Sequence, residues 1–175
     1  PPRTAFLGLC ELLGGERLTI SDGRPAFDSA WTPWRFAECA RDEPRGWQVT
    51  DLRDAAIHCA GAWSGRHSRI LLDLSGGLDS STVVSVINRL LPETAVQKTF
   101  SARFDDPARD EGKWMDLVTE SNRVERHDVW PTAERFFEEL RDLFWHQEEP
   151  FTSASVYAQW SVMRLAKEHG VTVLL

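Results

Sequence analysis

The chain has 175 residues, of which 42% are hydrophobic and 27% are charged, as in an ordinary globular protein with one core and room for a small appendage. Its formal net charge of −7 argues against a nucleic-acid partner, which would favour a basic patch. No apolar run approaches the roughly 18 residues that a membrane-spanning helix needs, so no membrane partner is expected either.

Residues 1–48 lack the sustained periodicity of the rest of the chain. Glu16–Ile20 is a strand candidate, and the turn residues Ser21-Asp22-Gly23-Arg24 follow it. Prolines at 25, 33 and 44 are expected to interrupt further elements, and Trp31-Thr32-Pro33-Trp34 is interpreted as a linker packed on a larger body. We therefore expect a short irregular segment over 1–48, the end of a preceding domain, and a second domain over 49–175.

From residue 50 onward, helical and strand-like patterns alternate. The predicted elements are a helix over 52–63, a strand over 69–74, a helix over 83–91, a strand over 96–104, a helix over 110–118, a strand over 124–130, helices over 133–144 and 156–166, and a strand over 171–175. Strands that alternate with helices in this way predict an α/β fold, an open parallel sheet with helices on both faces. Because the chain lacks an initiator Met and stops on an apolar strand, we expect it to be a fragment.

The most specific motif joins the 69–74 strand to the following helix and reads Leu74-Ser75-Gly76-Gly77-Leu78-Asp79-Ser80-Ser81. Two glycines allow the backbone to approach an anion closely, and a helix N-terminus offers free N–H groups at the positive end of its dipole. The serines add hydroxyl donors, and a carboxylate at Asp79 predicts a divalent cation that accompanies the phosphates. A serine-capped Gly-Gly turn is the alternative, but six specified positions in this context favour a polyphosphate site.

This loop resembles the pyrophosphate loop of the ATP pyrophosphatases, and Leu78 with the doubled serine makes it similar to the synthetase domain of asparagine synthetases. The resemblance implies an adenine nucleotide α-hydrolase-like fold, ATP and Mg²⁺ as cofactors, and Asp79 as the metal ligand. It implies a C–N ligase in which a carboxylate attacks the α-phosphate of ATP and an amine then displaces AMP from the acyl-adenylate. The residues that it implies for binding the nucleotide phosphates are Leu74, Ser75, Gly76, Gly77, Asp79, Ser80 and Ser81.

Three later stretches add to the resemblance. Phe100, Ser101 and Ala102 form the strand edge that it implies for adenine. Phe104-Asp105-Asp106-Pro107 with Asp110-Glu111 is similar to a family loop and supports the resemblance, although by itself the stretch would be read as a polar loop with Asp110 as a helix cap. Glu149-Pro150-Phe151 with Ser155 resembles the step before a substrate-side helix, which implies Glu149 and Ser155 for the substrate; an ordinary helix-start signal is the alternative.

Two departures from the family pattern leave the substrate open. Ala154 stands near the place where aspartate-specific members carry Arg, and position 1 is Pro where the glutaminase nucleophile would be Cys. A glutamine-hydrolysing asparagine synthase is the first hypothesis, with a small-molecule carboxylate as substrate. A macrolactam-forming cyclase of the lasso peptide or β-lactam type, without glutaminase, is the alternative, and a non-catalytic ATP-binding module is the second.

The remaining residues carry little functional signal. Cys10, Cys39 and Cys59 are widely spaced without a Cys-X-X-Cys pair, as in a protein of a reducing cytoplasm, and no catalytic residue is assigned. The eight tryptophans are expected to be mainly core or packing residues. The oligomeric state stays open, a homo-oligomer included.

Overall fold

A computed structural model describes residues 4–42, 46, 48–64, 70–171 and 173–174. The chain forms two compact units, one of Pro1–Trp47 with Glu148–Pro150 and the other of Gln48–Gln147 with Phe151–Leu175. The predicted domain division at residue 48 stays a prediction. None of the helices in the described ranges is long and apolar enough to cross a membrane.

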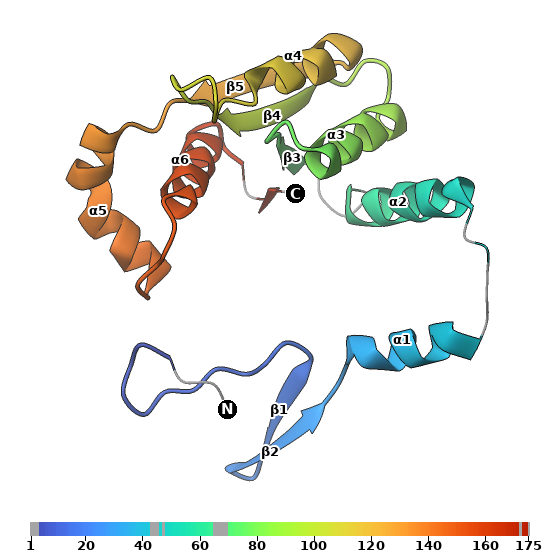
Figure 1. The fold of residues 1–175 in the computed structure, drawn as a ribbon, viewed down its shortest axis with the longest axis vertical. Helices are drawn as coiled ribbons and strands as arrows, with labels where there is room; N and C mark the ends of the chain where they lie inside the picture. Colours follow the sequence, from blue (N-terminus) through green and yellow to red (C-terminus); the bar gives the residue numbers. More distant parts are fainter. Residues whose placement is uncertain (1–3, 43–45, 47, 65–69, 172, 175) are drawn as a thin grey trace. The chain divides into compact units, whose positions relative to one another are not determined.

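The first unit contains a β-hairpin and a helix (Figure 1). β1 (Glu16–Ser21) pairs antiparallel with β2 (Arg24–Ser29), and Asp22 and Gly23 form the turn with positive φ angles of 50° and 73°. An Asp-Gly pair in this conformation matches the twist of a two-residue hairpin. Arg17 donates two hydrogen bonds to its cross-strand partner Asp28, at 3.0 and 2.9 Å.

Pro25 and Pro33 were expected to interrupt the elements of this unit, but they do not; Pro44 lies outside the described residues. Pro25 lies inside β2, opposite Ile20, in a two-stranded sheet where every strand is an edge and a missing N–H is tolerated. Pro33 begins helix α1 (Pro33–Asp42), a position where its absent N–H has no helical partner to lose. The expectation of a linker at Trp31–Trp34 was therefore wrong from Pro33 onward.

The second unit is built on a four-stranded sheet of order β5-β4-β3-β6, with every neighbouring pair parallel. The strands are β3 (Ile70–Asp73), β4 (Gln97–Ala102), β5 (Val124–Val129) and β6 (Val173–Leu174). All four were predicted from the apolar pattern, and the parallel arrangement follows from the helices between them. The α/β fold class is confirmed.

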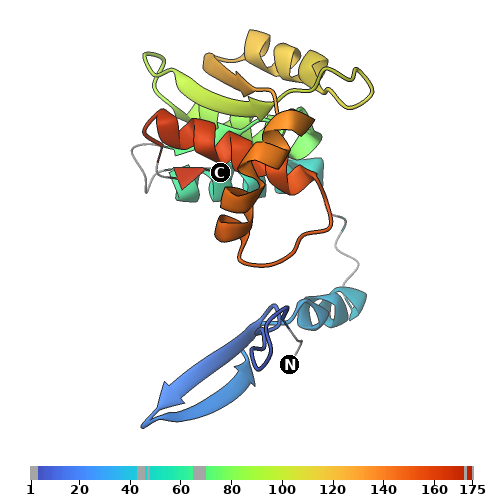
Figure 2. The same ribbon diagram turned by 90° about the vertical axis from the view of Figure 1, so that its left-hand side faces the viewer.

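The helices of the second unit lie on both faces of this sheet, as predicted. They are α2 (Val49–Ser64), α3 (Leu78–Leu90), α4 (Gly112–Ser121), α5 (Ala133–Gln147) and α6 (Ser155–Glu168). Helices α3 and α4 pack on one face, α2 packs on α3, and α6 crosses β4 and β5 on the opposite face. Figure 2 shows α6 in front of the strands.

Two apolar clusters hold these layers together. Leu74, Val84, Ile87 and Met115 fill the space beneath α3 and α4, and Phe100, Val162 and Ala166 fill the space beneath α6. The buried residues of these clusters are aliphatic side chains, one methionine and one phenylalanine, so the expectation that the tryptophans are mainly core or packing residues fails for the core. The tryptophans that are about half exposed or more are Trp31, Trp34, Trp63, Trp114, Trp130 and Trp145.

Candidate functional site

The loop from β3 to α3 needs glycine at position 76. Gly76 has φ = +83°, a conformation that residues with a Cβ adopt only with strain. A Cβ at this position would also lie 2.9 Å from Glu111 Cβ and 3.0 Å from the Glu111 carbonyl oxygen. Both the backbone conformation and the close approach of the loop before α4 therefore require glycine here.

The serines of the loop are joined by hydrogen bonds at the start of α3. Ser75 Oγ and Ser80 Oγ lie 3.1 Å apart, and Ser80 Oγ donates to the Gly77 carbonyl at 3.2 Å. Gly77 N–H points to Ser75 Oγ at 3.4 Å, and Ser81 N–H makes the first helical bond, to the Gly77 carbonyl at 3.1 Å. These contacts fold the hydroxyls around the N-terminus of the helix.

Helix α3 begins without a side-chain cap. Its N-cap residue, Gly77, is extended (φ −71°, ψ 164°) and provides no side-chain hydrogen bond to the first turn. Asp79 lies in this first turn and is exposed, where its charge is favourable to the helix dipole. A helix start with free N–H groups beside hydroxyl donors can bind a phosphate.

Two of the residues predicted to bind the nucleotide, Leu74 and Phe100, have buried side chains that pack in the core. Leu74 is completely buried, and its N–H donates to the Phe100 carbonyl at 2.9 Å. The Phe100 ring is also fully buried and stacks on His127, with ring centroids 4.9 Å apart. The side chains of Leu74 and Phe100 therefore serve packing, and the hydrogen bond between their backbones joins β3 to β4.

A cavity of about 230 Å³ lies at the carboxyl ends of β3 and β4 and reaches the first turns of α6. This is the edge at which open parallel sheets bind ligands. Among the predicted site residues, Ser75, Ala102 and Ser155 line the cavity. Ser101, the preceding residue of β4, is buried, and its Oγ has no hydrogen-bond partner among the described residues. The full lining is Asp73, Ser75, Ala102, Phe104, Arg109, Glu111, Met115, Ser155, Ala158, Gln159 and Val162.

The other predicted substrate residue, Glu149, is not brought into this cavity. It groups with the first unit, whereas Ser155 begins α6 in the second unit. The resemblance implied both residues for the substrate. The structure places only Ser155 among the cavity residues.

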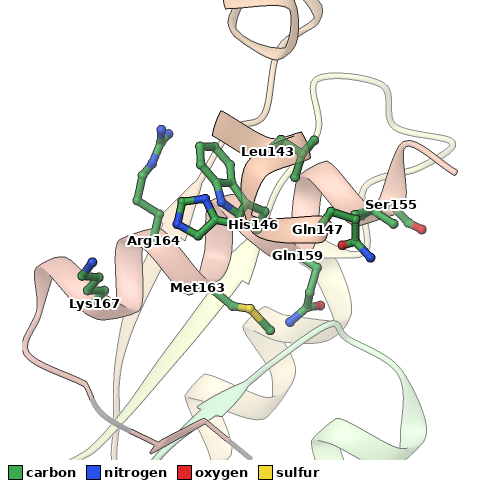
Figure 3. A pocket seen from close by; sticks show the side chains of 10 residues that line it. Leu143, His146, Gln147, Ser155, Gln159, Met163, Arg164 and Lys167 are labelled. Atoms are coloured by element: carbon green, nitrogen blue, oxygen red, sulfur yellow. The ribbon is translucent and has the colours of Figure 1, made fainter. Parts of the chain in front are cut away.

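A larger cavity, of about 820 Å³, lies between α5 and α6 (Figure 3). It shares Ser155 and Gln159 with the smaller one but contains no residue of the 74–81 loop. His146, Arg164 and Lys167 contribute its basic groups. Because Ser75 of the 74–81 loop and the ends of β3 and β4 line the smaller cavity together, we take that one as the candidate site.

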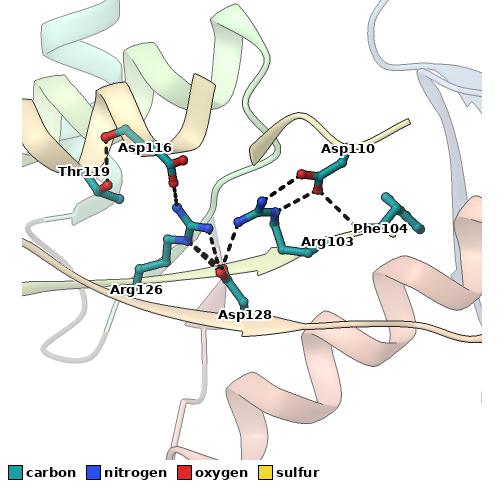
Figure 4. A network of polar contacts seen from close by, with 7 residues as sticks. All are labelled: Arg103, Phe104, Asp110, Asp116, Thr119, Arg126 and Asp128. Carbon is teal, nitrogen blue, oxygen red and sulfur yellow. Dashed lines mark hydrogen bonds and ion pairs between the residues drawn. The ribbon is translucent and has the colours of Figure 1, made fainter. Parts of the chain in front are cut away.

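An ion-pair network holds the 103–111 loop that closes one side of the site (Figure 4). Arg103 donates two hydrogen bonds of 2.7 Å to Asp110, and Phe104 N–H donates to the same carboxylate at 3.1 Å. The Arg103 guanidinium, the largest cause, holds the pKa of Asp110 down at about 2. Asp110 thus pairs with Arg103 and also accepts a hydrogen bond from the backbone of Gly112, the first residue of α4, whereas the N-cap residue itself is Glu111, without a side-chain cap bond.

The network continues to the edge strand β5. Asp128 accepts from Arg126 at 2.7 Å and lies 3.6 Å from the Arg103 guanidinium, and Arg126 also pairs with Asp116 of α4. These bonds fix the loop whose last residue, Glu111, abuts Gly76. No sequence rule links an arginine to an aspartate seven residues later in a loop, so the pattern gave no signal for this pair.

Asp73 is a further residue of the candidate site that the sequence analysis did not identify. It ends β3, is partly buried and lines the cavity. Burial, the largest cause, raises its pKa, and a hydrogen bond from Gln159 of α6 acts in the opposite direction. A carboxylate at the end of an apolar strand was the only signal in the sequence.

Comparison with known proteins gives a family match and two related sequences. Residues 67–175 match the family described as asparagine synthase. The putative asparagine synthetase [glutamine-hydrolyzing] 2 of Methanocaldococcus jannaschii is 38% identical over 103 residues, covering 58% of this chain and 19% of that protein. Asparagine synthetase [glutamine-hydrolyzing] 1 of Bacillus subtilis is 31% identical over 127 residues, covering 73% of this chain and 20% of that protein. The chain thus spans about a fifth of the length of these relatives.

Among solved structures, an NMN synthetase from Francisella tularensis is similar to the chain with a TM-score of 0.45 and 14% sequence identity. The alignment covers 73% of this chain and 53% of that one.

Proposed function

The chain belongs to the asparagine synthase family, and we propose that it supplies the ATP site of an enzyme that makes amide bonds through an acyl-adenylate. The observation that carries the proposal is the loop over Ser75–Ser81, which Gly76 fits against Glu111 and which opens helix α3 without a side-chain cap. Such a loop at the carboxyl end of β3 is suited to a polyphosphate. The adjoining cavity offers room for the rest of a substrate.

In the proposed reaction, an oxygen of a substrate carboxylate attacks the α-phosphate of ATP and pyrophosphate leaves. A nitrogen nucleophile then attacks the acyl carbon, forms the C–N bond, and releases AMP and a proton. The free N–H groups at the start of α3, with the Ser75 and Ser80 hydroxyls, would hold the departing pyrophosphate. The backbone N–H donors are in place before the reaction, so they can stabilise the developing charge without reorganisation, whereas the Ser80 hydroxyl must turn away from the Gly77 carbonyl to donate to a phosphate.

Asp79 is the residue that would hold Mg²⁺ beside the phosphates. No group of three or more acidic, His or Cys side chains suited to a metal occurs within the described part of the chain. This donor set fits Mg²⁺ that arrives with ATP, because Mg²⁺ commonly binds through one or two carboxylates together with substrate phosphates. The ion would supply charge neutralisation to the leaving pyrophosphate.

The two catalytic alternatives differ in the nitrogen donor. Glutamine-dependent amidation of aspartate, as in the names of the two relatives, is the first candidate. A macrolactam-forming cyclase is the second, and the specific observation in its favour is exposed Ala154 at the start of α6, where no arginine is present to bind a free α-carboxylate. A non-catalytic ATP-binding module is the third reading, and the intact set of loop hydroxyls with Asp79 argues against it.

The test is product analysis with the full-length protein. We expect ATP and Mg²⁺ with the correct carboxylate substrate to give AMP and pyrophosphate, and ADP as the product would refute the proposal. Glutamine hydrolysis measured in the same preparation separates the first two alternatives. Mg²⁺-independent ATP binding without pyrophosphate release from any carboxylate donor would favour the third.

A further inference from the structure

Asp73 places a carboxylate in the candidate site that neither the fold nor the proposed chemistry explains. It follows three apolar residues of β3 and precedes Leu74, which is completely buried. Among the described residues, the group that opposes the rise of its pKa is the neutral side chain of Gln159. None of the ion pairs between described residues of this unit includes it.

The groups that share the cavity with Asp73 leave its charge uncompensated. Arg109 is the one cation among the lining residues, but its side chain is 79% exposed and faces Asp106, with Nε 3.5 Å from the carboxylate. Glu111 adds a second negative charge, and Ser155 and Gln159 are neutral. Burial therefore raises the pKa of Asp73 with no cation in the lining paired to it, and ionisation of Asp73 lowers the stability of the fold. A carboxylate that destabilises the fold is suited to a ligand that brings hydrogen-bond donors.

The position of Asp73 along the sheet indicates which part of a nucleotide it meets. The polyphosphate loop begins two residues later, at Ser75, and Ala102 at the end of the neighbouring strand lines the same cavity. Asp73 is paired with Phe100 in the register, so Ala102 lies farther along β4. A nucleotide with its phosphates on the loop and its base near Ala102 must carry its ribose past the end of β3.

We propose that the Asp73 carboxylate accepts hydrogen bonds from the ribose hydroxyls of ATP and so makes the site selective for ribonucleotides. An acidic side chain serves this purpose in other nucleotide-binding α/β sheets, because a carboxylate has two oxygens and can accept from both hydroxyls. Gln159 holds the carboxylate from α6 and acts as a positioning residue. This inference rests on the proposed function, since it assumes that the cavity binds ATP.

The test compares nucleotide binding by calorimetry to the full-length protein, with Mg²⁺ and without a carboxylate substrate. The ligands are ATP, 2′-deoxyATP, 3′-deoxyATP and ITP, whose base lacks the 6-amino group. We expect the wild type to bind a deoxynucleotide about tenfold or more weakly than ATP, because a hydrogen bond to a charged group is lost. The affinities of Asp73→Leu for ATP and for both deoxynucleotides should lie within about twofold of one another. The preference of Asp73→Asn for ATP should be intermediate between those of the wild type and Asp73→Leu. Glu120→Gln, an exposed acid on α4, is the matched charge control and should behave as the wild type.

A second readout does not depend on nucleotide. Because the folded-state pKa of Asp73 is raised, stability is lost as the pH rises through that pKa. At neutral pH, Asp73→Asn should therefore melt at a higher temperature than the wild type in the absence of ligand, whereas Glu120→Gln should not. A lower melting temperature for Asp73→Asn would show that the carboxylate is structural and would overturn the inference.

The outcomes separate this inference from the proposed function. If the wild type binds ATP but Asp73→Leu keeps its preference over the deoxynucleotides, the ATP site stands and the role of Asp73 is refuted. If Asp73→Leu loses only its preference over ITP, the carboxylate contacts the base, and the ribose assignment is likewise overturned. If the wild type binds none of the four nucleotides, the proposed function itself fails and this inference with it.

Discussion

Asp110→Asn tests whether the ion pair with Arg103 holds the loop beside Gly76. The substitution keeps the side-chain shape and an acceptor oxygen for Phe104 N–H, but it removes the charge opposite the guanidinium. The Asp110 pKa of about 2, against an ordinary 3.8, reflects chiefly the hydrogen bonds from Arg103. Since one pH unit in a pKa corresponds to about 1.4 kcal/mol, the ionised carboxylate stabilises the fold by about 2 kcal/mol. The Asp110 side chain is only 16% exposed, so solvent screens this interaction weakly.

The pH dependence of this effect follows from the depressed pKa. The contribution is complete above about pH 5. It disappears as the pH falls through 3.8 toward 2, because over this range the unfolded chain takes up a proton at Asp110 more readily than the folded protein does. We expect the free energy of unfolding of the variant to fall below that of the wild type by about 2 kcal/mol at pH 7 and by about half as much at pH 3. Urea denaturation followed by tryptophan fluorescence measures both differences.

Asp106→Asn is the matched control in the same loop. The Asp106 side chain is 54% exposed and its oxygen lies 3.5 Å from Arg109 Nε, so its charge should be worth less than about 0.5 kcal/mol. Equal losses of stability in the two variants would refute the reasoning. A loss in Asp110→Asn that does not diminish on acidification would refute it as well.

Three further predictions concern the loop and the contact between α5 and α6. Gly76→Ala should lower the free energy of unfolding by about 2 kcal/mol or more and abolish ATP binding. Gly170→Ala, also at positive φ but in open space, is the control and should lower it by only about 1 kcal/mol. Equal losses in denaturation would argue against the close packing of the loop. Asp79→Asn should remove the Mg²⁺ dependence of ATP affinity in calorimetry while changing stability by under about 1 kcal/mol, and a parallel loss of both would indicate a structural role. Tyr157 is the single tyrosine of these 175 residues, and burial with its 2.7 Å hydrogen bond to Glu139 raises its pKa to about 12, so its phenolate absorbance should appear only near that pH and at lower pH in Glu139→Gln. Unchanged titration in that variant would exclude the bond as a cause.

Local patterns were sufficient to predict the elements of the second unit. The apolar run before Leu74 and the helical spacing after it predicted β3 and α3, because both signals depend on residues that are neighbours in the chain. The same reasoning failed at Pro25 and Pro33. Proline blocks the interior of a helix or a sheet, but it is compatible with an edge strand and with the first turn of a helix, and only pairing partners or boundaries distinguish these cases.

The sequence by itself thus determined the α/β class and the strand–loop–helix motif with its two glycines, since each depends on residues that are contiguous in the chain. Only the tertiary structure decided which side chains meet at the loop. Gly76 meets Glu111 because α4 packs beside α3, and Asp73 meets Gln159 because α6 crosses the opposite face of the sheet. Such encounters depend on how helices pack across a sheet, and a periodic pattern says which face of a helix is buried without saying which residue lies opposite it.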